Sequence, residues 1–318
     1  MNPAGMMAGV EAYRRRFGRR TPPAVDDMHT SFRHREVVLA WPCHAEHGWC
    51  LADSVLFLQL HGQPRRLGLV GQPGTYQDGG VIKTAALLPA DLNRLTRETD
   101  MLLATVDSLT DEEFAAPSKC EGWTRAHVVA HLALGADAMG NMITWGTTGV
   151  ETPPYVSWDA CNADIENLAK KSPAEIKAAL RTAIKNFADK AETLKDGLKA
   201  ETVKTARGAS ITPYAVPALR ISEVIIHHAD LDTVWGLGEA DMDALEDTLE
   251  IVVERVSANE DFPGVTVDTD EGEHYDIGDG ATAIKGGRDA VIGWLARGLT
   301  DGVRYDGELP ERPARSIG

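Results

Sequence analysis

Two segments that lie far apart in the 318-residue chain constrain its fold more than any other feature. Their sequences are CEGWTRAHVVAHLA at residues 120–133 and ALRISEVIIHHADLDTVWG at residues 218–236. Each has the apolar spacing of an amphipathic helix, and each carries two potential metal ligands four residues apart. These pairs are His127 with His131, and Glu223 with His227. Side chains four apart lie next to each other on one helical face, so we expect the two faces to meet inside a helical bundle.

The carboxylate of Glu223 requires a positive partner if these faces are buried. It lies on an otherwise apolar face, as do His131 and His227, and a buried carboxylate without a partner costs several kcal/mol. Arg220, one turn earlier, is one candidate partner, and the histidines are then incidental. In the other interpretation, His131, Glu223 and His227 hold zinc with a fourth position left for an exchangeable ligand, as in catalytic zinc sites. Spacing alone favours neither alternative.

The remaining pattern predicts the α+β class, with a four-helix bundle followed by a small α+β domain. Long helices are expected at 87–109, 124–145, 172–195 and 217–236. A shorter helix is expected at 158–170. Beyond the bundle we expect helices at 241–257 and 288–297, with short strands at 265–268, 274–277, 281–284 and 303–305. The predicted domains are 1–83, a poorly ordered leader and linker, 84–238, the bundle, and 239–318, the α+β domain.

The leader is broken repeatedly by Pro and Gly and shows no sustained helical or strand periodicity. A start site assigned too far upstream would account for it. Cys43, His44, His47 and Cys50 lie within eight residues, but structural zinc sites usually divide their ligands between two separated pairs. We therefore do not expect a zinc site there.

Composition excludes several functional classes. The net charge is −16, and residues 84–318 carry 22 Lys and Arg against 41 Asp and Glu, which disfavours binding to nucleic acid. No apolar run approaches the roughly 20 residues of a membrane helix, and no secretory signal is recognisable. Four cysteines are too few for a disulfide framework. We expect a cytoplasmic protein that acts on a small molecule.

Residues 87–236 resemble the N-terminal domain of mycothiol-dependent maleylpyruvate isomerases, a branch of the DinB-like four-helix bundles. The matching blocks are GWT-x-x-HV-x-AHL at 122–132 and R-x-x-E-x-x-x-HH-x-D-L at 220–231, together with SLTDEEFAAPSKCEGW at 108–123. The resemblance implies a zinc ion held by His131, Glu223 and His227. His127 is the alternative first ligand, and His228 and Asp230 are expected to orient a ligand.

The resemblance also implies a reaction, the cis–trans isomerisation of maleylpyruvate to fumarylpyruvate. Mycothiol supplies a thiolate that adds to the conjugated alkene, permits rotation and then leaves, and zinc binds that thiolate or polarises the substrate carbonyl. A dianionic substrate calls for arginine. The candidates are Arg297, which resembles a C-terminal arginine of the family, and Arg220. Cys120 and Cys161 are less favoured sources of the sulfur.

Two other functions are consistent with the same sequence. A mycothiol S-transferase acting on electrophiles would use the same metal ligands with a different substrate pocket. A non-catalytic regulator would keep the bundle for zinc or thiol sensing. An isomerase does not consume thiol, a transferase does so stoichiometrically, and a regulator does neither.

Overall fold

The computed structural model describes residues 29–33, 36–42, 49–51 and 83–312. The chain divides into two compact units, residues 1–77 and 78–318. In the first unit, β1 (His29–Arg33), β2 (Glu36–Pro42) and β3 (Trp49–Leu51) form an antiparallel sheet in the order β1-β2-β3. The sequence pattern did not predict these strands. The group formed by Cys43, His44, His47 and Cys50 lies outside the residues whose side chains the structure describes.

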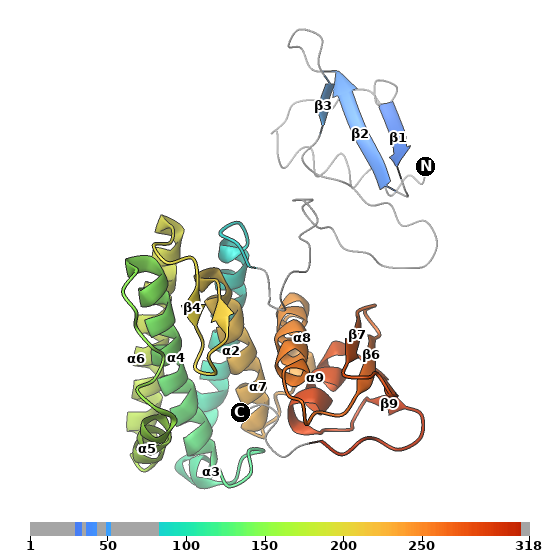
Figure 1. The fold of residues 1–318 in the computed structure, drawn as a ribbon. Coiled ribbons are helices and arrows are strands. Elements are labelled where there is room, and N and C mark those ends of the chain that lie inside the picture. The colour runs from blue at the N-terminus through green and yellow to red at the C-terminus, as the bar shows by residue number, and fades with distance from the viewer. Residues whose placement is uncertain (1–28, 34–35, 43–48, 52–82, 313–318) are drawn as a thin grey trace. The chain divides into compact units, whose positions relative to one another are not determined.

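Four long helices form the first half of the second unit, close to the positions predicted from periodicity (Figure 1). They are α2 (Leu88–Ser108), α4 (Arg125–Thr148), α6 (Pro173–Glu192) and α7 (Val216–Asp230). Helix α4 packs against α6 and α7, while α2 packs mainly against α7. Two short helices, α3 (Asp111–Ala115) and α5 (Trp158–Ala169), lie against α4. No helix among the described residues is long and apolar enough to cross a bilayer.

Local sequence signals begin these helices. Ser172 accepts a hydrogen bond from the backbone N–H of Glu175, and the Glu175 carboxylate accepts one from Ser172, so α6 starts with a capping box followed by Pro173. Thr110 and Glu113 form the same arrangement before α3. Thr124 begins α4, where Nδ1 of His127 accepts from the Thr124 backbone N–H at 3.2 Å.

Helix α7 ends at Asp230, six residues before the predicted stop at Gly236. The chain leaves the helix through Asp232, which has a positive φ of 53°, a conformation that Asp tolerates better than most residues. Arg125 of α4 donates to the carbonyl oxygens of Leu231 and Asp232. A side chain distant in sequence thus satisfies carbonyls at the end of the helix, which a local pattern does not reveal.

The second half of the unit confirms the α+β prediction. Helices α8 (Met242–Ser257) and α9 (Arg288–Arg297) pack against each other. Strands β6 (Val265–Thr269), β7 (His274–Ile277), β8 (Thr282–Gly286) and β9 (Arg304–Tyr305) form a sheet in the order β7-β6-β8-β9. Only the β6–β8 pair is parallel. A hairpin of β4 (Val203–Lys204) and β5 (Ser210–Ile211), with 3₁₀ turns η2 (Thr193–Asp196), η3 (Pro213–Ala215) and η4 (Leu237–Glu239), completes the described elements.

Helix α8 joins the two halves, because it packs against α7 on one side and against α9 and β7 on the other (Figure 1). The buried hydrophobic cluster is continuous across it. Near α2, Lys83 forms ion pairs with Asp91 at 3.2 Å and with Asp247 of α8 at 2.8 Å. Glu98 of α2, which is fully buried, accepts a hydrogen bond from the backbone N–H of Asp241 at 2.9 Å. The start of α8 is therefore bound directly to α2.

Candidate metal centre

Helices α4 and α7 bring three potential metal ligands together. Nε2 of His131 lies 3.3 Å from Oε2 of Glu223, and Nε2 of His227 lies 3.4 Å from the same oxygen. One ligand atom from each of the three residues lies within 4.8 Å of the others. The imidazole rings of His131 and His227 meet edge to face, with centroids 4.5 Å apart. Two imidazole nitrogens and a carboxylate oxygen, mostly buried, are a donor set that fits zinc.

Electrostatics of this cluster favour an ionised carboxylate between the imidazoles. Burial raises the pKa of Glu223, but hydrogen bonds from His131 and His227 and the charge of Arg255 outweigh it, so the pKa lies well below its ordinary value. Burial and the neighbouring His227 lower the pKa of His131. This shift favours the neutral imidazole of His131, the form that binds metal.

Asp230 and Arg297 form a chain of contacts on the Nδ1 side of His227. Nδ1 of His227 lies 2.8 Å from Oδ2 of Asp230, although the ring N–H is not well aligned with that oxygen. Arg297 of α9 donates from Nε and Nη2 to the two oxygens of Asp230, at 2.8 and 2.7 Å. Burial raises the pKa of Asp230, but His227 and Arg297 outweigh it and lower the pKa well below its ordinary value. A carboxylate behind an imidazole is a recurrent feature of metal centres.

Comparison with known proteins identifies the family of the segment that carries this centre. Residues 95–232 match the family model described as the mycothiol maleylpyruvate isomerase N-terminal domain. This part of the chain belongs to that family. The matched residues include all three potential ligands and Asp230, whereas Arg297 lies outside the match. No curated protein matches the chain in sequence.

Solved structures extend the likeness beyond the matched domain. The crystal structure of a mycothiol-dependent maleylpyruvate isomerase has a TM-score of 0.67 and 25% sequence identity, and covers 73% of this chain and 99% of that one. A mutant form has the same TM-score and coverage with 24% identity. The fold of the whole helical and α+β unit is therefore similar to that of a mycothiol-dependent maleylpyruvate isomerase.

Two other histidines of the family-like blocks lie away from the cluster. His127, the alternative first ligand, uses Nδ1 to cap α4 through Thr124, and its Nε2 lies 3.4 Å from Glu166 of α5. His228, which we expected to orient a ligand, stacks on Trp235 with centroids 3.8 Å apart. Its Nε2 lies 2.7 Å from the hydroxyl of Thr105. That expectation is wrong because successive helical residues point in directions about 100° apart, so the residue after His227 turns into the packing with α2.

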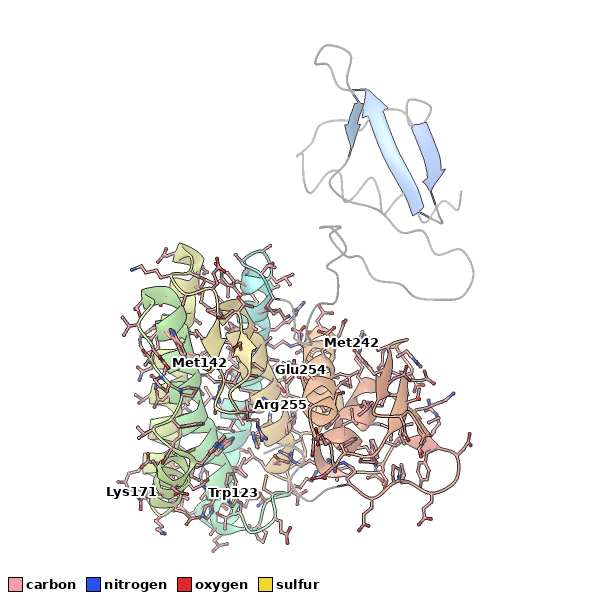
Figure 2. All side chains as sticks on the ribbon, viewed as in Figure 1. Trp123, Met142, Lys171, Met242, Glu254 and Arg255 are labelled. Carbon is pink, nitrogen blue, oxygen red and sulfur yellow. The ribbon has the colours of Figure 1, made fainter. Side chains whose placement is uncertain are left out.

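The arginine that contacts Glu223 is Arg255 of α8, at 3.2 Å from Oε1 (Figure 2 labels Arg255). Among the described residues no ion pair joins Arg220 to Glu223, so the simple Arg220–Glu223 alternative is not what the structure contains. Arg220 is 2% exposed, and neither Nη1 nor Nη2 has a hydrogen-bond partner in the described part of the chain. Burial lowers the pKa of Arg220 to about 10, despite the opposing charge of Glu223.

Further residues near the cluster were not assigned to it from the sequence. The thiol of Cys120 forms a second group with His227 and Asp230, again with atoms within 4.8 Å. Trp123 lies against His131, with ring centroids 5.6 Å apart (Figure 2 labels Trp123). Tyr155, in the loop after α4, packs with Trp123 against the cluster that contains the buried Cys161. Cys120 and Trp123 precede α4 within the sequence block that carries His131, so their position in the sequence indicated that they lie near it. No local sequence pattern indicated the same for Arg255 or Tyr155.

Proposed function

We propose that this protein is a zinc- and mycothiol-dependent cis–trans isomerase of the maleylpyruvate-to-fumarylpyruvate type. The observation that carries the proposal is the convergence of His131, Glu223 and His227 within a segment that belongs to the mycothiol maleylpyruvate isomerase N-terminal domain family. The similar solved structure is that of a mycothiol-dependent maleylpyruvate isomerase, which supports the same reaction class.

In this proposal, His131, Glu223 and His227 hold the metal and the surrounding residues fix their orientation. Zinc supplies a Lewis acid that favours a bound thiol in its thiolate form or polarises a carbonyl. Arg255 holds the second oxygen of Glu223, which leaves Oε2 directed at the two imidazoles. Asp230, held in turn by Arg297, sets the ring of His227.

The thiol cofactor supplies a nucleophile whose reversible addition to a conjugated alkene permits rotation about the former double bond. The contribution of the chain is to position the two carboxylates of the keto acid. Arg220 is the best-placed donor, because its Nη1 and Nη2 are buried without hydrogen-bond partners among the described residues, and Nη1 lies 3.6 Å from the Cβ position that a side chain at Gly135 would occupy. Gly135 is one turn beyond His131 on α4, so the guanidinium group of Arg220 lies against the same face of α4 as His131. A substrate carboxylate matches its planar fork.

Arg297 contributes differently in this proposal. Its Nε and Nη2 are engaged with Asp230, so we assign it a positioning role on His227. If Arg297 also contacts substrate, it would do so through donors other than Nε and Nη2. The S-transferase remains the second candidate, since the family match covers the metal ligands but ends at residue 232, before the part of the chain in which a different substrate pocket would be built.

Metal analysis of the purified protein, followed by an ultraviolet assay on maleylpyruvate with and without mycothiol, tests the proposal. We expect bound zinc in a ratio of about one per chain and mycothiol-dependent formation of fumarylpyruvate with the total thiol concentration unchanged. Stoichiometric loss of thiol with an electrophile, without isomerisation, would instead establish the transferase. Protein that binds zinc but catalyses neither reaction would refute both enzymatic assignments.

A further inference from the structure

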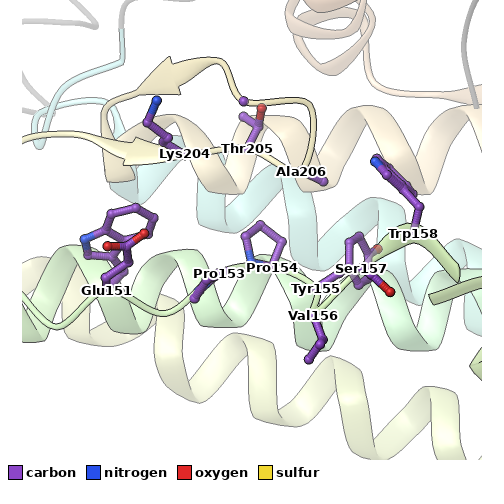
Figure 3. A pocket seen from close by; sticks show the side chains of 12 residues that line it. Glu151, Pro153, Pro154, Tyr155, Val156, Ser157, Trp158, Lys204, Thr205 and Ala206 are labelled. Atoms are coloured by element: carbon purple, nitrogen blue, oxygen red, sulfur yellow. The ribbon is translucent and has the colours of Figure 1, made fainter. Parts of the chain in front are cut away.

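A groove of about 310 Å³ lies between the loop that follows α4 and the β4–β5 hairpin (Figure 3). One wall is formed by residues 151 and 153–158, with Trp145 of α4, and the other by residues 204–206 and 208. Its volume is within the range of pockets that bind small molecules. Neither the proposed metal ligands nor the proposed substrate arginines line it, so the groove is distinct from the ligand cluster itself.

The lining of the groove combines aromatic faces with charged and hydroxyl groups. Trp145, Tyr155 and Trp158 supply the rings, and Trp158 is 51% exposed, an unusual state for so large a hydrophobic side chain. The rings of Tyr155 and Trp158 lie 5.7 Å apart. Glu151 and Lys204 add opposite charges, and neither has an ion-pair partner within the described part of the chain.

This combination suits a polyhydroxylated ring. The C–H faces of such a ring pack on aromatic side chains, which present a flat surface and a polar edge. Its hydroxyl groups donate to a carboxylate such as Glu151 and accept from an ammonium group such as Lys204. An apolar ligand would leave Glu151 and Lys204 without polar partners. A ligand with a large net charge would be repelled by one of the two, an anion by Glu151 and a cation by Lys204.

Tyr155 connects the groove to the metal centre. Its side chain lines the groove and, like Trp123, also packs against the buried cluster that contains Ala130 and Cys161. Trp123 in turn lies against His131, with ring centroids 5.6 Å apart. The Tyr155 end of the groove therefore approaches His131, one of the residues that we propose to hold zinc. A ligand that extends along the groove can place one end near that centre.

We infer that the groove binds a polyhydroxylated, sugar-like ring, and that the body of the thiol cofactor, remote from its sulfur, is the ligand that supplies it. This inference rests on the proposed function for the identity of the cofactor. The sulfur would reach the metal centre past Tyr155, while the body would lie between Trp158 and the Lys204 strand.

Binding of S-methylated mycothiol to the full-length protein, measured by isothermal titration calorimetry, tests the inference without depending on turnover or on a free thiol. We expect Trp158→Ala and Lys204→Ala each to weaken binding about tenfold, since an aromatic stacking contact or a charge-assisted hydrogen bond has a value of that order. Tyr305→Ala is the matched control, because Tyr305 is 42% exposed on β9 and does not line the groove. Its affinity should equal that of the unmodified protein.

A second measurement compares mycothiol with N-acetylcysteine, a small thiol, in the isomerisation assay. Trp158→Ala should raise the KM for mycothiol about tenfold and change the KM for N-acetylcysteine much less, with zinc content unchanged. Equal affinities for all variants, or no binding of S-methylated mycothiol by an active isomerase, would overturn the inference and leave the proposed function intact. Groove-dependent binding by a protein without isomerase activity would overturn the proposed function alone.

Discussion

At the scale of single residues, the proposed metal ligands differ from their histidine neighbours in what their side chains contact. We expect His131→Ala, Glu223→Gln and His227→Ala each to remove most bound zinc and all isomerase activity, because a three-residue ligand set cannot lose a member and keep its affinity. Helicity, measured by circular dichroism, should be largely retained. Metal analysis by mass spectrometry is the primary readout.

His127→Ala is the matched control for those variants. His127 caps α4 through Thr124, so its loss should lower the free energy of unfolding by about 1 kcal/mol and leave zinc bound. Retention of metal and turnover in all three ligand variants, or loss of zinc in His127→Ala, would contradict the assignment of the centre.

Asp230 provides a second prediction at this scale. Asp230→Asn should weaken zinc binding by roughly 10–100-fold, the usual effect of removing a carboxylate that orients a histidine ligand. Asp232→Asn is the control, since Asp232 is exposed and its carboxylate has only one ion pair among the described residues, a 3.6 Å contact with Lys119. Its positive φ is one that Asn also adopts readily. A competition assay with a chelator measures both affinities, and equal values would remove Asp230 from the centre.

The proposed ligands show how much of the site could be predicted from residue spacing alone. Positions four apart identified the pair on α7 that the structure brings together with His131, but gave no means of choosing between His127 and His131. A signal for that choice was present, because Thr124 and His127 have the spacing of a helix cap and its third residue. Arg255 carried no such signal, since it reaches Glu223 from a helix 32 residues later and only tertiary packing brings them together.

At the scale of elements, the contact between α2 and the start of α8 contains a buried carboxylate whose ionised form is destabilised. Glu98 is fully buried and its Oε2 has no hydrogen-bond partner among the described residues. Burial raises its pKa above the ordinary value of 4.5. Because the folded state binds the proton more tightly than the unfolded state, ionised Glu98 opposes folding at neutral pH, and this cost disappears below pH 4.5.

We therefore expect Glu98→Gln to be more stable than the unmodified protein at pH 7, by roughly 1 kcal/mol. The difference should shrink as the pH falls toward 4.5, because Glu98 becomes protonated in the folded state first and, below that pH, in the unfolded state as well. Urea unfolding at pH 7 and at pH 4.5 measures it, with the exposed Glu112→Gln as control. A pH-independent difference would show that charge burial is not its cause.

Prediction of elements from sequence succeeded where the signal was local. The start of α6 followed from Ser172, Pro173 and Glu175, and the strands after α8 lie within two residues of their predicted positions. The end of α7 was placed too late because Arg125, from another helix, satisfies the carbonyls beyond Asp230. Strands β1 to β3 had no periodicity that distinguished them from irregular chain.

At the scale of the whole molecule, the division at residues 77 and 78 predicts a functional boundary. Removing residues 1–77 should leave zinc content, melting temperature and isomerase activity unchanged, because Lys83 and its ion pairs with Asp91 and Asp247 are retained. Differential scanning calorimetry and the ultraviolet assay compare the two proteins. An insoluble or inactive truncation would show that the first unit contributes to the second.

The link from α9 through Arg297 and Asp230 to His227 has a thermodynamic consequence. If zinc favours the orientation of His227 that this link stabilises, then occupancy of the centre and docking of the last helix strengthen each other by the same free energy. Amide hydrogens of α9 should then exchange more slowly in zinc-loaded protein than after chelation. By the same reciprocity we expect Arg297, outside the matched domain, to be a residue through which the C-terminal half changes the affinity of the centre for the ion.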